Sequence, residues 1–346
     1  MMWSHQDFDD HEAIHYFTDR QSGLKAIIAI HSTHRGPASG GVRFWHYARE
    51  EDALTDALRL SRGMSYKNAM AGLPIGGGKG VILSDGTPKT AEQLAAFGAA
   101  IDSLGGRYVT AEDVGMSEAD MTAIARRTRH VSGLPVASGQ AGGDPGPVTA
   151  RGVYLGVRAA IAEGLGREDV AGVHVAIQGV GSVGGGLARR LAADGARLTL
   201  ADMDRRKAEA LASEIGAAVT DAGEIMTIEA DVFSPNALGA ILDERSIPLL
   251  QAGIVAGGAN NQLATHADAQ RLHERGVLYA PDYVINAGGI INVASEYLGL
   301  GDRAAVDARV DEIPDRLRAI WAESKATGMP AADVADAMAR RLIGRD

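Results

Sequence analysis

Two lysines that could share one substrate, Lys67 and Lys79, stand in the stretch SYKNAMAGLPIGGGKGVIL, residues 65–83. Three consecutive glycines directly precede Lys79, and the apolar residues 81–83 after it predict a short buried strand. Because glycine has no side chain, a ligand can approach the backbone closely at this point. A single lysine is usually a solvated surface charge, but the glycines, the apolar flanks and the second lysine together favour a binding site.

This pair of lysines suits a substrate that carries a carboxylate beside a carbonyl group. Lys67 can neutralise the carboxylate. Partial burial and the nearby second cation would both lower the pKa of Lys79, so that it can act as a base towards water or polarise a carbonyl oxygen. Asp113, at the end of a predicted strand over residues 107–110, could carry a proton to and from the substrate nitrogen. The alternative role of Asp113 is that of a turn or helix-capping residue.

A second candidate site is the motif GVGSVG, which follows a predicted buried strand over residues 174–178. A helix over residues 187–193 and a second strand over residues 197–201 are expected next, which gives the frame of a dinucleotide-binding unit. The free N–H groups and the dipole at the start of such a helix favour phosphate. The residues expected to contact the cofactor in this loop are Gly179, Gly181, Ser182, Val183 and Gly184. The alternative is a glycine turn that packs a helix on the sheet without a ligand.

The second strand ends at Asp202, which stands 23 residues after Gly179. A carboxylate there would accept hydrogen bonds from ribose hydroxyls and repel a 2′-phosphate, which favours NAD over NADP. The basic residues Arg205 and Arg206 follow at once, so some use of NADP stays open.

The elements around these sites alternate between strands and helices, which indicates an α/β fold. A strand is expected over residues 26–30 and an amphipathic helix over residues 50–62, and Thr149 is expected to cap a long helix. Short strands further on end in polar loops that contain Asn236 and Asn260. Ligands of open α/β sheets bind at such strand ends, although turn formation is the alternative for each asparagine.

Length and composition limit the class of protein. A chain of 346 residues predicts two domains, and the five glycines and three prolines of residues 132–147 mark the linker between them. The net charge of −10 argues against a nucleic-acid or anionic-membrane partner, and the absence of cysteine excludes disulfides and thiolate metal sites. No metal site is predicted. The first residues lack a signal-peptide pattern and no apolar run approaches the length of a membrane span, so a cytoplasmic location is expected.

Seven segments together resemble the amino-acid dehydrogenases of the leucine, phenylalanine and valine branch, which are relatives of glutamate dehydrogenase. These segments are GGVRFW (40–45), SYKNAMAGLPIGGGKGVI (65–82), GRYVTAEDVG (106–115), PVTARGVY (147–154), QGVGSVG (178–184), GGANNQL (257–263) and YAPDYVINAGGIINVA (279–294). The resemblance runs from about Gly23 to the C-terminus. It implies reversible oxidative deamination, in which an L-amino acid, NAD and water give the 2-oxo acid, ammonia and NADH.

The resemblance also implies roles for single residues. Lys67 would bind the substrate carboxylate, Lys79 would be the catalytic base and Asp113 would assist proton transfer. Further residues implied to line the substrate or cofactor sites are Gly40, Gly76, Gly77 and Asn261 on the substrate side, and Thr149, Asn236, Asn260 and Asn286 on the cofactor side.

The pocket for the substrate side chain would be formed by Ser39, Ala111, Ile290 and Val293. These residues are mostly small and apolar, and none offers the cation that a glutamate side chain would need. Leucine-type enzymes carry a leucine where Ser39 stands, so the serine makes room for phenylalanine or another large side chain.

The resemblance implies a substrate domain of residues 1–140 with about 320–346, and a Rossmann-like NAD-binding domain of residues 141–320. The C-terminal helices would pack back on the first domain, and the protein would be a dimer, tetramer or octamer. Two other classes compete with this interpretation. A regulatory NAD-binding protein would not need Lys67, Lys79 and Asp113 together, and a 2-hydroxy-acid dehydrogenase would need an arginine and a histidine–acid pair.

Overall fold

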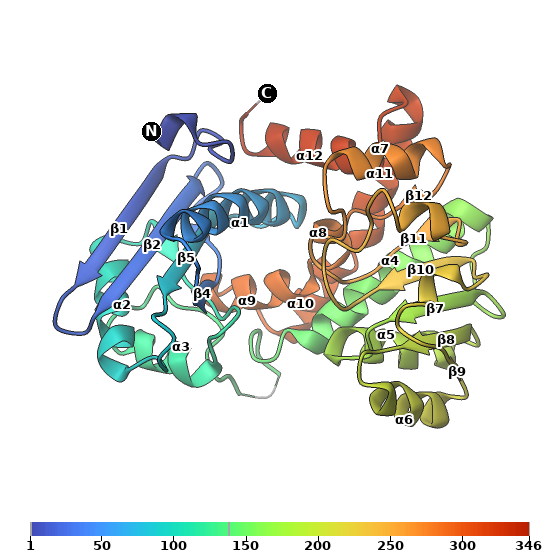
Figure 1. The fold of residues 1–346 in the computed structure, drawn as a ribbon, viewed down its shortest axis with the longest axis horizontal. Helices are drawn as coiled ribbons and strands as arrows, with labels where there is room; N and C mark the ends of the chain where they lie inside the picture. Colours follow the sequence, from blue (N-terminus) through green and yellow to red (C-terminus); the bar gives the residue numbers. More distant parts are fainter. Residues whose placement is uncertain (1, 138, 346) are drawn as a thin grey trace. The chain divides into compact units, whose positions relative to one another are not determined.

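The computed structural model describes residues 2–137 and 139–345, and the chain forms two compact units (Figure 1). Unit 1 comprises Met1–Asp144, Ile290–Val306 and Ala339–Asp346, and unit 2 comprises Pro145–Gly289 and Asp307–Met338. The first change of unit falls within the glycine- and proline-rich stretch 132–147. The sequence-based bounds divide the C-terminal part differently: they place residues 290–306 with the second domain and about 320–338 with the first. These bounds stay a prediction.

Unit 1 is built on a mixed six-stranded sheet. Its strands are β1 (Ala13–Asp19), β2 (Leu24–Ser32), β3 (Ala38–Ser39), β4 (Val42–Trp45), β5 (Gly76–Leu83) and β6 (Tyr108–Val109). The strand order is β1-β2-β5-β3-β6, and β4 also pairs with β5. Strands β1, β2 and β5 pair antiparallel, whereas β3 and β4 run parallel to β5. Strand β5, which carries Lys79, is therefore surrounded by pairing partners.

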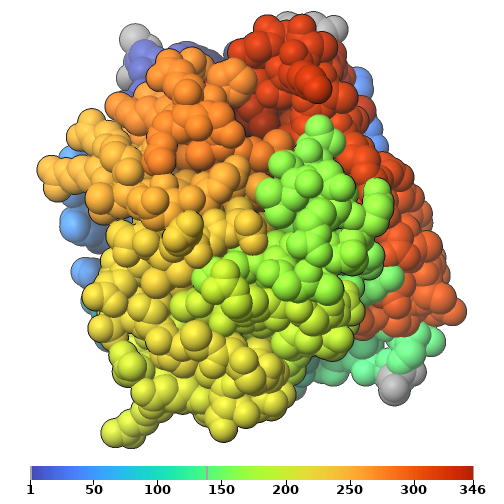
Figure 2. Space-filling model, turned by 90° about the vertical axis from the view of Figure 1, so that its right-hand side faces the viewer, coloured from blue at the N-terminus to red at the C-terminus, as the bar shows by residue number. Residues whose placement is uncertain are grey.

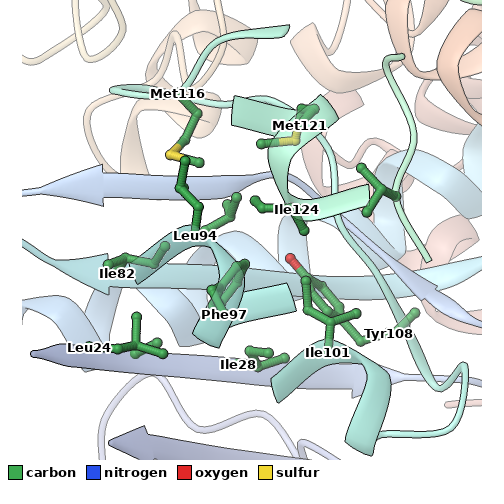
Figure 3. Close-up of a cluster of buried hydrophobic side chains, with 14 of the residues drawn as sticks. Leu24, Ile28, Ile82, Leu94, Phe97, Ile101, Tyr108, Met116, Met121 and Ile124 are labelled. Atoms are coloured by element: carbon green, nitrogen blue, oxygen red, sulfur yellow. The ribbon is translucent and has the colours of Figure 1, made fainter. Parts of the chain in front are cut away.

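Both faces of this sheet are covered. Strand β2 is buried along most of its length, and alternate residues point to opposite faces because the side-chain period of a strand is two. Ile27 and Ala29 pack against α1 (Glu50–Met70), whereas Ile28 and Ile30 belong to a cluster with α2 (Ala91–Ser103) and α3 (Glu118–Ala125). Figure 3 shows this second cluster, which gathers side chains from β2, β5, α2 and α3.

Helix caps define where α2 and α3 begin. Thr90 and Gln93 form a capping box at α2, and Ser117 and Asp120 form another at α3. In each box the hydroxyl accepts from the backbone N–H three residues on and the side chain there accepts from the cap N–H. Each box is a local motif, because the two side chains that form it stand three residues apart in the sequence.

Helix α1 is longer than predicted. It continues from Glu50 to Met70, whereas the sequence predicts an end at Arg62. Lys67 therefore lies in the last turn of a helix, and the glycines at 76–78 belong to strand β5 itself. The helix continues because residues 65–70 pack into the core, with Ser65, Tyr66 and Asn68 all buried.

The glycines of β5 are required by packing. A Cβ at Gly77 would lie 2.0 Å from the backbone nitrogen of Ser65 in α1, and one at Gly78 would lie 2.8 Å from the ring of Tyr108. On the neighbouring strand, a Cβ at Gly40 would lie 1.8 Å from the carbonyl oxygen of Gly78. The glycines thus let the end of α1 and Tyr108 approach the strand from opposite faces.

Unit 2 is built on an all-parallel sheet with the order β12-β11-β10-β7-β8-β9. The strands are β7 (His174–Gln178), β8 (Arg197–Ala201), β9 (Ala218–Val219), β10 (Val232–Pro235), β11 (Ile254–Val255) and β12 (Leu278–Tyr279). The chain leaves β7 towards β8 on one side and later returns to β10 on the other. This is the Rossmann order, and its switch point lies between β7 and β10.

The helices of unit 2 are α4 (Gly146–Leu165), α5 (Ser182–Ala193), α6 (Arg205–Ile215), α7 (Ala267–Glu274), α8 (Asp282–Ile285) and α11 (Ile313–Thr327). Short 3-10 turns occur at Ile225–Thr227 and Ile247–Leu249 of this unit and at Met2–Ser4 of unit 1. Figure 2 shows the surface of the green, yellow and orange segments of unit 2. Thr149 does not cap α4, because the helix already begins at Gly146 with a proline in its first turn.

Three C-terminal helices run across the unit boundaries: α9 (Gly288–Leu298), α10 (Arg303–Val310) and α12 (Ala331–Leu342). The last residues of the chain return to unit 1, where Arg345 donates to the carbonyl oxygens of Asp9 (2.6 Å), Asp10 (2.9 Å) and His31 (2.6 Å). The predicted α/β fold, with a mixed-sheet domain, a Rossmann-like domain and C-terminal helices on the first domain, is confirmed.

No helix among residues 2–137 and 139–345 is both long and apolar enough to cross a membrane. In the same residues, no group of three or more acidic or histidine side chains is placed to hold a metal ion.

We predict that Gly77→Ala destabilises the fold strongly, by about 3 kcal/mol, because the added methyl group overlaps the α1 backbone. Gly63→Ala on the exposed side of α1 is the matched control, because a Cβ there meets no atom within 4 Å. It should stabilise the helix by about 0.5–1 kcal/mol. Urea unfolding of both variants measures the difference, and equal stabilities would contradict the packing requirement.

Candidate active site

The centre of the candidate site is an ion pair between Lys79 of β5 and Asp113. The ammonium group of Lys79 contacts Oδ2 of Asp113, and only 5% of the lysine is exposed. Lys79 stands opposite Ala29 in the sheet, on the face that α1 covers. A buried lysine is stable only with a partner for its charge, and the carboxylate supplies it.

Asp113 reaches this position through the loop that follows β6. The loop extends the sheet beside β4, where Val42 N–H donates to the carbonyl oxygen of Ala111 (2.8 Å) and Phe44 N–H to that of Val114 (3.0 Å). A Cβ at Gly41 would lie 2.9 Å from Cβ of Asp113. Glycine at this position therefore allows the carboxylate to lie close to the sheet.

A second cation, Arg43 of β4, shares the same carboxylate. Its Nε lies 3.3 Å from Oδ2 of Asp113, and its Nη1 donates to Oδ2 of Asp56 in α1 (2.7 Å). The hydroxyl of Tyr47 also donates to Oδ2 of Asp56 (2.8 Å). The site is thus a network of two cations, two carboxylates and one phenol.

Burial and the neighbouring charges move the pKa values within this network. Burial lowers the pKa of Lys79, and the positive charge of Arg43 lowers it further, while Asp113 acts in the opposite direction. Burial alone would raise the pKa of Asp113, but Lys79 and Arg43 together hold it below its usual value. Asp113 therefore stays ionised, while burial and Arg43 lower the proton affinity of Lys79. The sequence did not indicate this role of Arg43, and the effect predicted for Lys67 stays a prediction.

Lys67 lies half-buried in the last turn of α1. The segment just before it is fixed through Ser65, whose hydroxyl lies 2.7 Å from Nδ1 of His31. The other ring nitrogen of His31, Nε2, lies 2.7 Å from Nη1 of Arg345 and 3.2 Å from Oδ2 of Asp9. Burial lowers the pKa of His31, which favours its neutral form. The end of α1 is thus anchored to the sheet through His31.

The four residues predicted for the side-chain pocket all belong to unit 1. Ser39 is buried on β3 opposite Gly77 and Val109, and Ala111 follows β6 two residues after Val109. Ile290 and Val293 are half-buried on α9. Gly40 and Gly76, predicted to line the substrate site, are buried, and a Cβ there would lie 1.8 Å from the carbonyl oxygen of Gly78 and 1.9 Å from that of Ser32, respectively. The substrate contacts of these residues stay a prediction.

The predicted cofactor loop lies at the switch point of the parallel sheet. Gly179 follows β7 with a φ of +86°, a conformation that favours glycine. Helix α5 begins at Ser182, and its N-cap residue Gly181 gives no side-chain cap. A Cβ at Gly184 would lie 1.9 Å from the carbonyl oxygen of Gly179, whereas one at Gly181 would meet nothing within 4 Å. The loop leaves space and uncapped N–H groups where a pyrophosphate would bind.

Asp202 already supports this loop. Its Oδ2 accepts from the N–H of Val180 (2.9 Å), and its Oδ1 accepts from the N–H of Asp204 (2.9 Å). The acidic residue at the end of β8 is therefore held beside the glycine loop, as a ribose-binding carboxylate requires.

The asparagines near the switch point hold one loop from two sides. Asn236 accepts from the N–H of Gly258 (2.9 Å), and Asn286 donates to the carbonyl oxygen of Gly258 (3.1 Å) and to the side-chain oxygen of Asn260 (2.8 Å). Asn261 has a positive φ of 52° in the same loop. Thr149 donates back to the carbonyl oxygen of Pro145 (2.8 Å) within α4. Whether these residues also contact a cofactor stays a prediction.

Comparisons with known proteins bear on both units. Residues 11–130 match the model described as Glu/Leu/Phe/Val dehydrogenase, dimerisation domain, and residues 199–340 match the model described as Glutamate/Leucine/Phenylalanine/Valine dehydrogenase. The chain is 45% identical to leucine dehydrogenase of Geobacillus stearothermophilus over 99% of its own length and 93% of that enzyme.

The chain belongs to the Glu/Leu/Phe/Val dehydrogenase family.

Other relatives in this family differ in the substrate that they are named for. Valine dehydrogenase of Streptomyces virginiae is 46% identical, with 98% of this chain and 95% of that enzyme covered. The crystal structure of L-tryptophan dehydrogenase from Nostoc punctiforme has a TM-score of 0.86, 41% identity and 96% coverage of each chain. The protein is thus an amino-acid dehydrogenase, an oxidoreductase that acts on CH–NH2 donors and uses an NAD(P) cofactor, and the predicted family and enzyme class are confirmed.

Three members of the charged network were missed at the sequence level: Arg43, Asp56 and Tyr47. Arg43 stands in GGVRFW, a segment that carries the family resemblance, but its pairing with Asp113 spans 70 residues. The parallel pairing of β4 and β5 places Arg43 opposite Val81, on the same face as Lys79. Because side chains alternate between the two faces of a strand, the register of β4 against β5 would have shown that Arg43 and Lys79 share a face. That register cannot be read from the sequence.

We predict that Gly181→Ala in this family member weakens NADH binding by about tenfold or more while the stability of the protein is unchanged. The added methyl group enters open space in the protein but occupies the site of close phosphate approach. Fluorescence titration with NADH and thermal unfolding measure the two effects.

Gly184→Ala is the matched control, because its methyl group would overlap the Gly179 carbonyl. It should lose stability and binding together. Normal NADH affinity of Gly181→Ala would show that phosphate binds elsewhere.

Proposed function

We propose that this amino-acid dehydrogenase catalyses the reversible, NAD-dependent oxidative deamination of an apolar L-amino acid to the 2-oxo acid and ammonia. The observation that carries the proposal is the buried Lys79–Asp113 pair, whose lysine has a lowered pKa because of burial. A lysine whose pKa is lowered loses its proton more readily and is therefore better suited to general-base catalysis. The family membership of the chain supports the same reaction.

The residues of the chain would divide the chemistry between them. Lys67 would bind the substrate carboxylate. When bound, the nicotinamide ring supplies an acceptor for the hydride from the α-carbon. Lys79 would take a proton from the water that adds to this carbon, and Asp113 would carry a proton to the departing nitrogen. Water thereby supplies the carbonyl oxygen, and nitrogen leaves as ammonia.

The cofactor would be held by unit 2. The glycine loop and the start of α5 would receive the pyrophosphate, and Asp202 the adenosine ribose. Further contacts proposed for the nicotinamide end come from Thr149, Asn236, Asn260 and Asn286, which lie at the switch point or in α4. The carboxylate of Asp202 favours NAD because it would repel a 2′-phosphate.

The substrate side chain would contact Ser39, Ala111, Ile290 and Val293. None of these is charged, so leucine, valine, isoleucine or phenylalanine fits better than glutamate. Relatives named for leucine, valine and tryptophan agree with an apolar substrate. Another large or aromatic amino acid is the alternative, since Ser39 is small. A homo-oligomer is proposed from the matched dimerisation domain.

The decisive experiment is NADH oxidation with excess ammonium across five 2-oxo acids. These are 4-methyl-2-oxopentanoate, 3-methyl-2-oxobutanoate, phenylpyruvate, indolepyruvate and 2-oxoglutarate. We predict turnover of the apolar acids and little with 2-oxoglutarate. Lys79→Ala should reduce turnover by about 10²–10⁴-fold while NADH still binds. The absence of ammonium-dependent turnover with every acid would exclude the deamination proposal.

We predict that Asp202→Asn narrows the preference for NADH over NADPH. The amide keeps an oxygen acceptor for the Val180 N–H but removes the charge that repels a 2′-phosphate. Asp202→Ala should weaken both cofactors, because the loop also loses its support. Dissociation constants for NADH and NADPH measure this, and an unchanged ratio in both variants would place cofactor choice elsewhere.

A further inference from the structure

We propose that Arg43 is a positioning residue that shares Asp113 with Lys79 and thereby sets the pH at which the lysine can act as a base. The inference rests on the proposed function, in which Lys79 removes a proton from water, because it explains what sets the pH at which Lys79 can do so. Arg43 itself has no role in the proposed function.

The guanidinium of Arg43 is held between two carboxylates. It contacts Asp113 through Nε (3.3 Å) and Asp56 through Nη1 (2.7 Å), and its side chain is 23% exposed. Asp56 in turn accepts from the hydroxyl of Tyr47 (2.8 Å). The planar fork of arginine can bind two acceptors in fixed directions, which a lysine cannot reproduce. Arg43 is therefore fixed in place by α1 as well as by its own strand.

Two cations meet the same oxygen atom, Oδ2 of Asp113. When Lys79 loses its proton, the carboxylate keeps Arg43 as its counter-ion, so it does not become a buried charge without a partner. Without Arg43, the carboxylate would depend on Lys79 for its counter-ion and would hold the lysine proton more tightly. Arg43 therefore favours the neutral form of Lys79 and the ionised form of Asp113 at the same pH.

The charged and titratable groups around this carboxylate come from several elements. They include Lys79 from β5, Arg43 from β4, Asp56 from α1, and the phenols of Tyr47 and Tyr108. The positive charge of Arg43 lowers the pKa of Lys79, whereas the negative charge of Asp56 raises it. Burial keeps both phenols protonated by raising their pKa values. Removal of the Arg43 charge should thus raise the pKa of Lys79, and removal of the Asp56 charge should lower it.

The lysines can be titrated directly, because the chain contains only six: Lys25, Lys67, Lys79, Lys89, Lys207 and Lys325. Protein labelled with ¹³C at the lysine ε-carbon would give few signals, and the spectrum of Lys79→Ala identifies the signal of Lys79. In Arg43→Gln, the pKa of Lys79 should rise by about one unit or more, a tenfold change in proton affinity. In Asp56→Asn, it should fall.

Two further variants make the comparison specific. Arg43→Lys keeps the charge and should give a smaller shift than Arg43→Gln. Arg59→Gln removes an arginine on the exposed side of α1, whose side chain is 61% exposed. This control variant should leave the pKa of Lys79 unchanged. If Arg43→Gln does not fold, the opposite shifts expected for Asp56→Asn and Arg43→Lys still test the proposal.

The rate of deamination supplies a second readout. The acidic limb of the kcat/KM profile should move to higher pH in Arg43→Gln by the same amount as the titration of Lys79, with activity largely recovered at high pH. A residue needed only for structure would lower kcat at every pH without moving this limb. An unchanged Lys79 titration in Arg43→Gln overturns the proposal. If the titration of Lys79 shifts in Arg43→Gln but the unsubstituted protein shows no ammonium-dependent turnover, the role of Arg43 is supported and the proposed reaction is refuted.

Discussion

The burial of the Lys79 ammonium group beside the carboxylate of Asp113 is the constraint on which the arrangement of unit 1 depends. A buried ion pair is costly to desolvate, and its attraction compensates only where further partners satisfy the remaining atoms. Arg43, Asp56 and Tyr47 provide those partners from β4, α1 and the segment between them. The sheet supplies Lys79 and Arg43, the helix α1 that covers it supplies Asp56, and the loop after β6 supplies Asp113.

This arrangement requires a helix to lie unusually close to a strand. The glycines of β5 remove the side chains that would separate them, so the backbone of Ser65 lies directly over Gly77. On the other face, Tyr108 fills the space beside Gly78 and Gly80, and its hydroxyl donates to the carbonyl oxygen of Gly40 (2.6 Å). The three glycines at residues 76–78, which resemble a ligand-binding loop in the sequence, therefore also allow α1 and Tyr108 to pack on the two faces of β5.

Local rules were enough to predict the regular parts of the molecule. The strand–loop–helix–strand frame around Gly179 depends on neighbouring residues and lies where the sequence indicates, although α5 begins at Ser182, five residues before the predicted start. The capping boxes at Thr90 and Ser117 depend in the same way on residues close in the sequence. The extension of α1 past Arg62 was missed because it depends on burial against the sheet. The contacts of Arg43 were missed for the same reason, since they depend on the register of two strands. Long motifs indicated the family and the reaction, but no pattern in one sequence selects one apolar substrate among several.

The anchoring of Arg345 on the backbone of Asp9, Asp10 and His31 joins the two ends of the chain within one unit. During synthesis the N-terminal part of a protein leaves the ribosome first and generally begins to fold first. Here the sheet of unit 1 emerges early, but Arg345 follows the backbone that it contacts by 314 to 336 residues. All of unit 2 lies between them in the sequence, so unit 1 can form these contacts only after the whole of unit 2 has been synthesised.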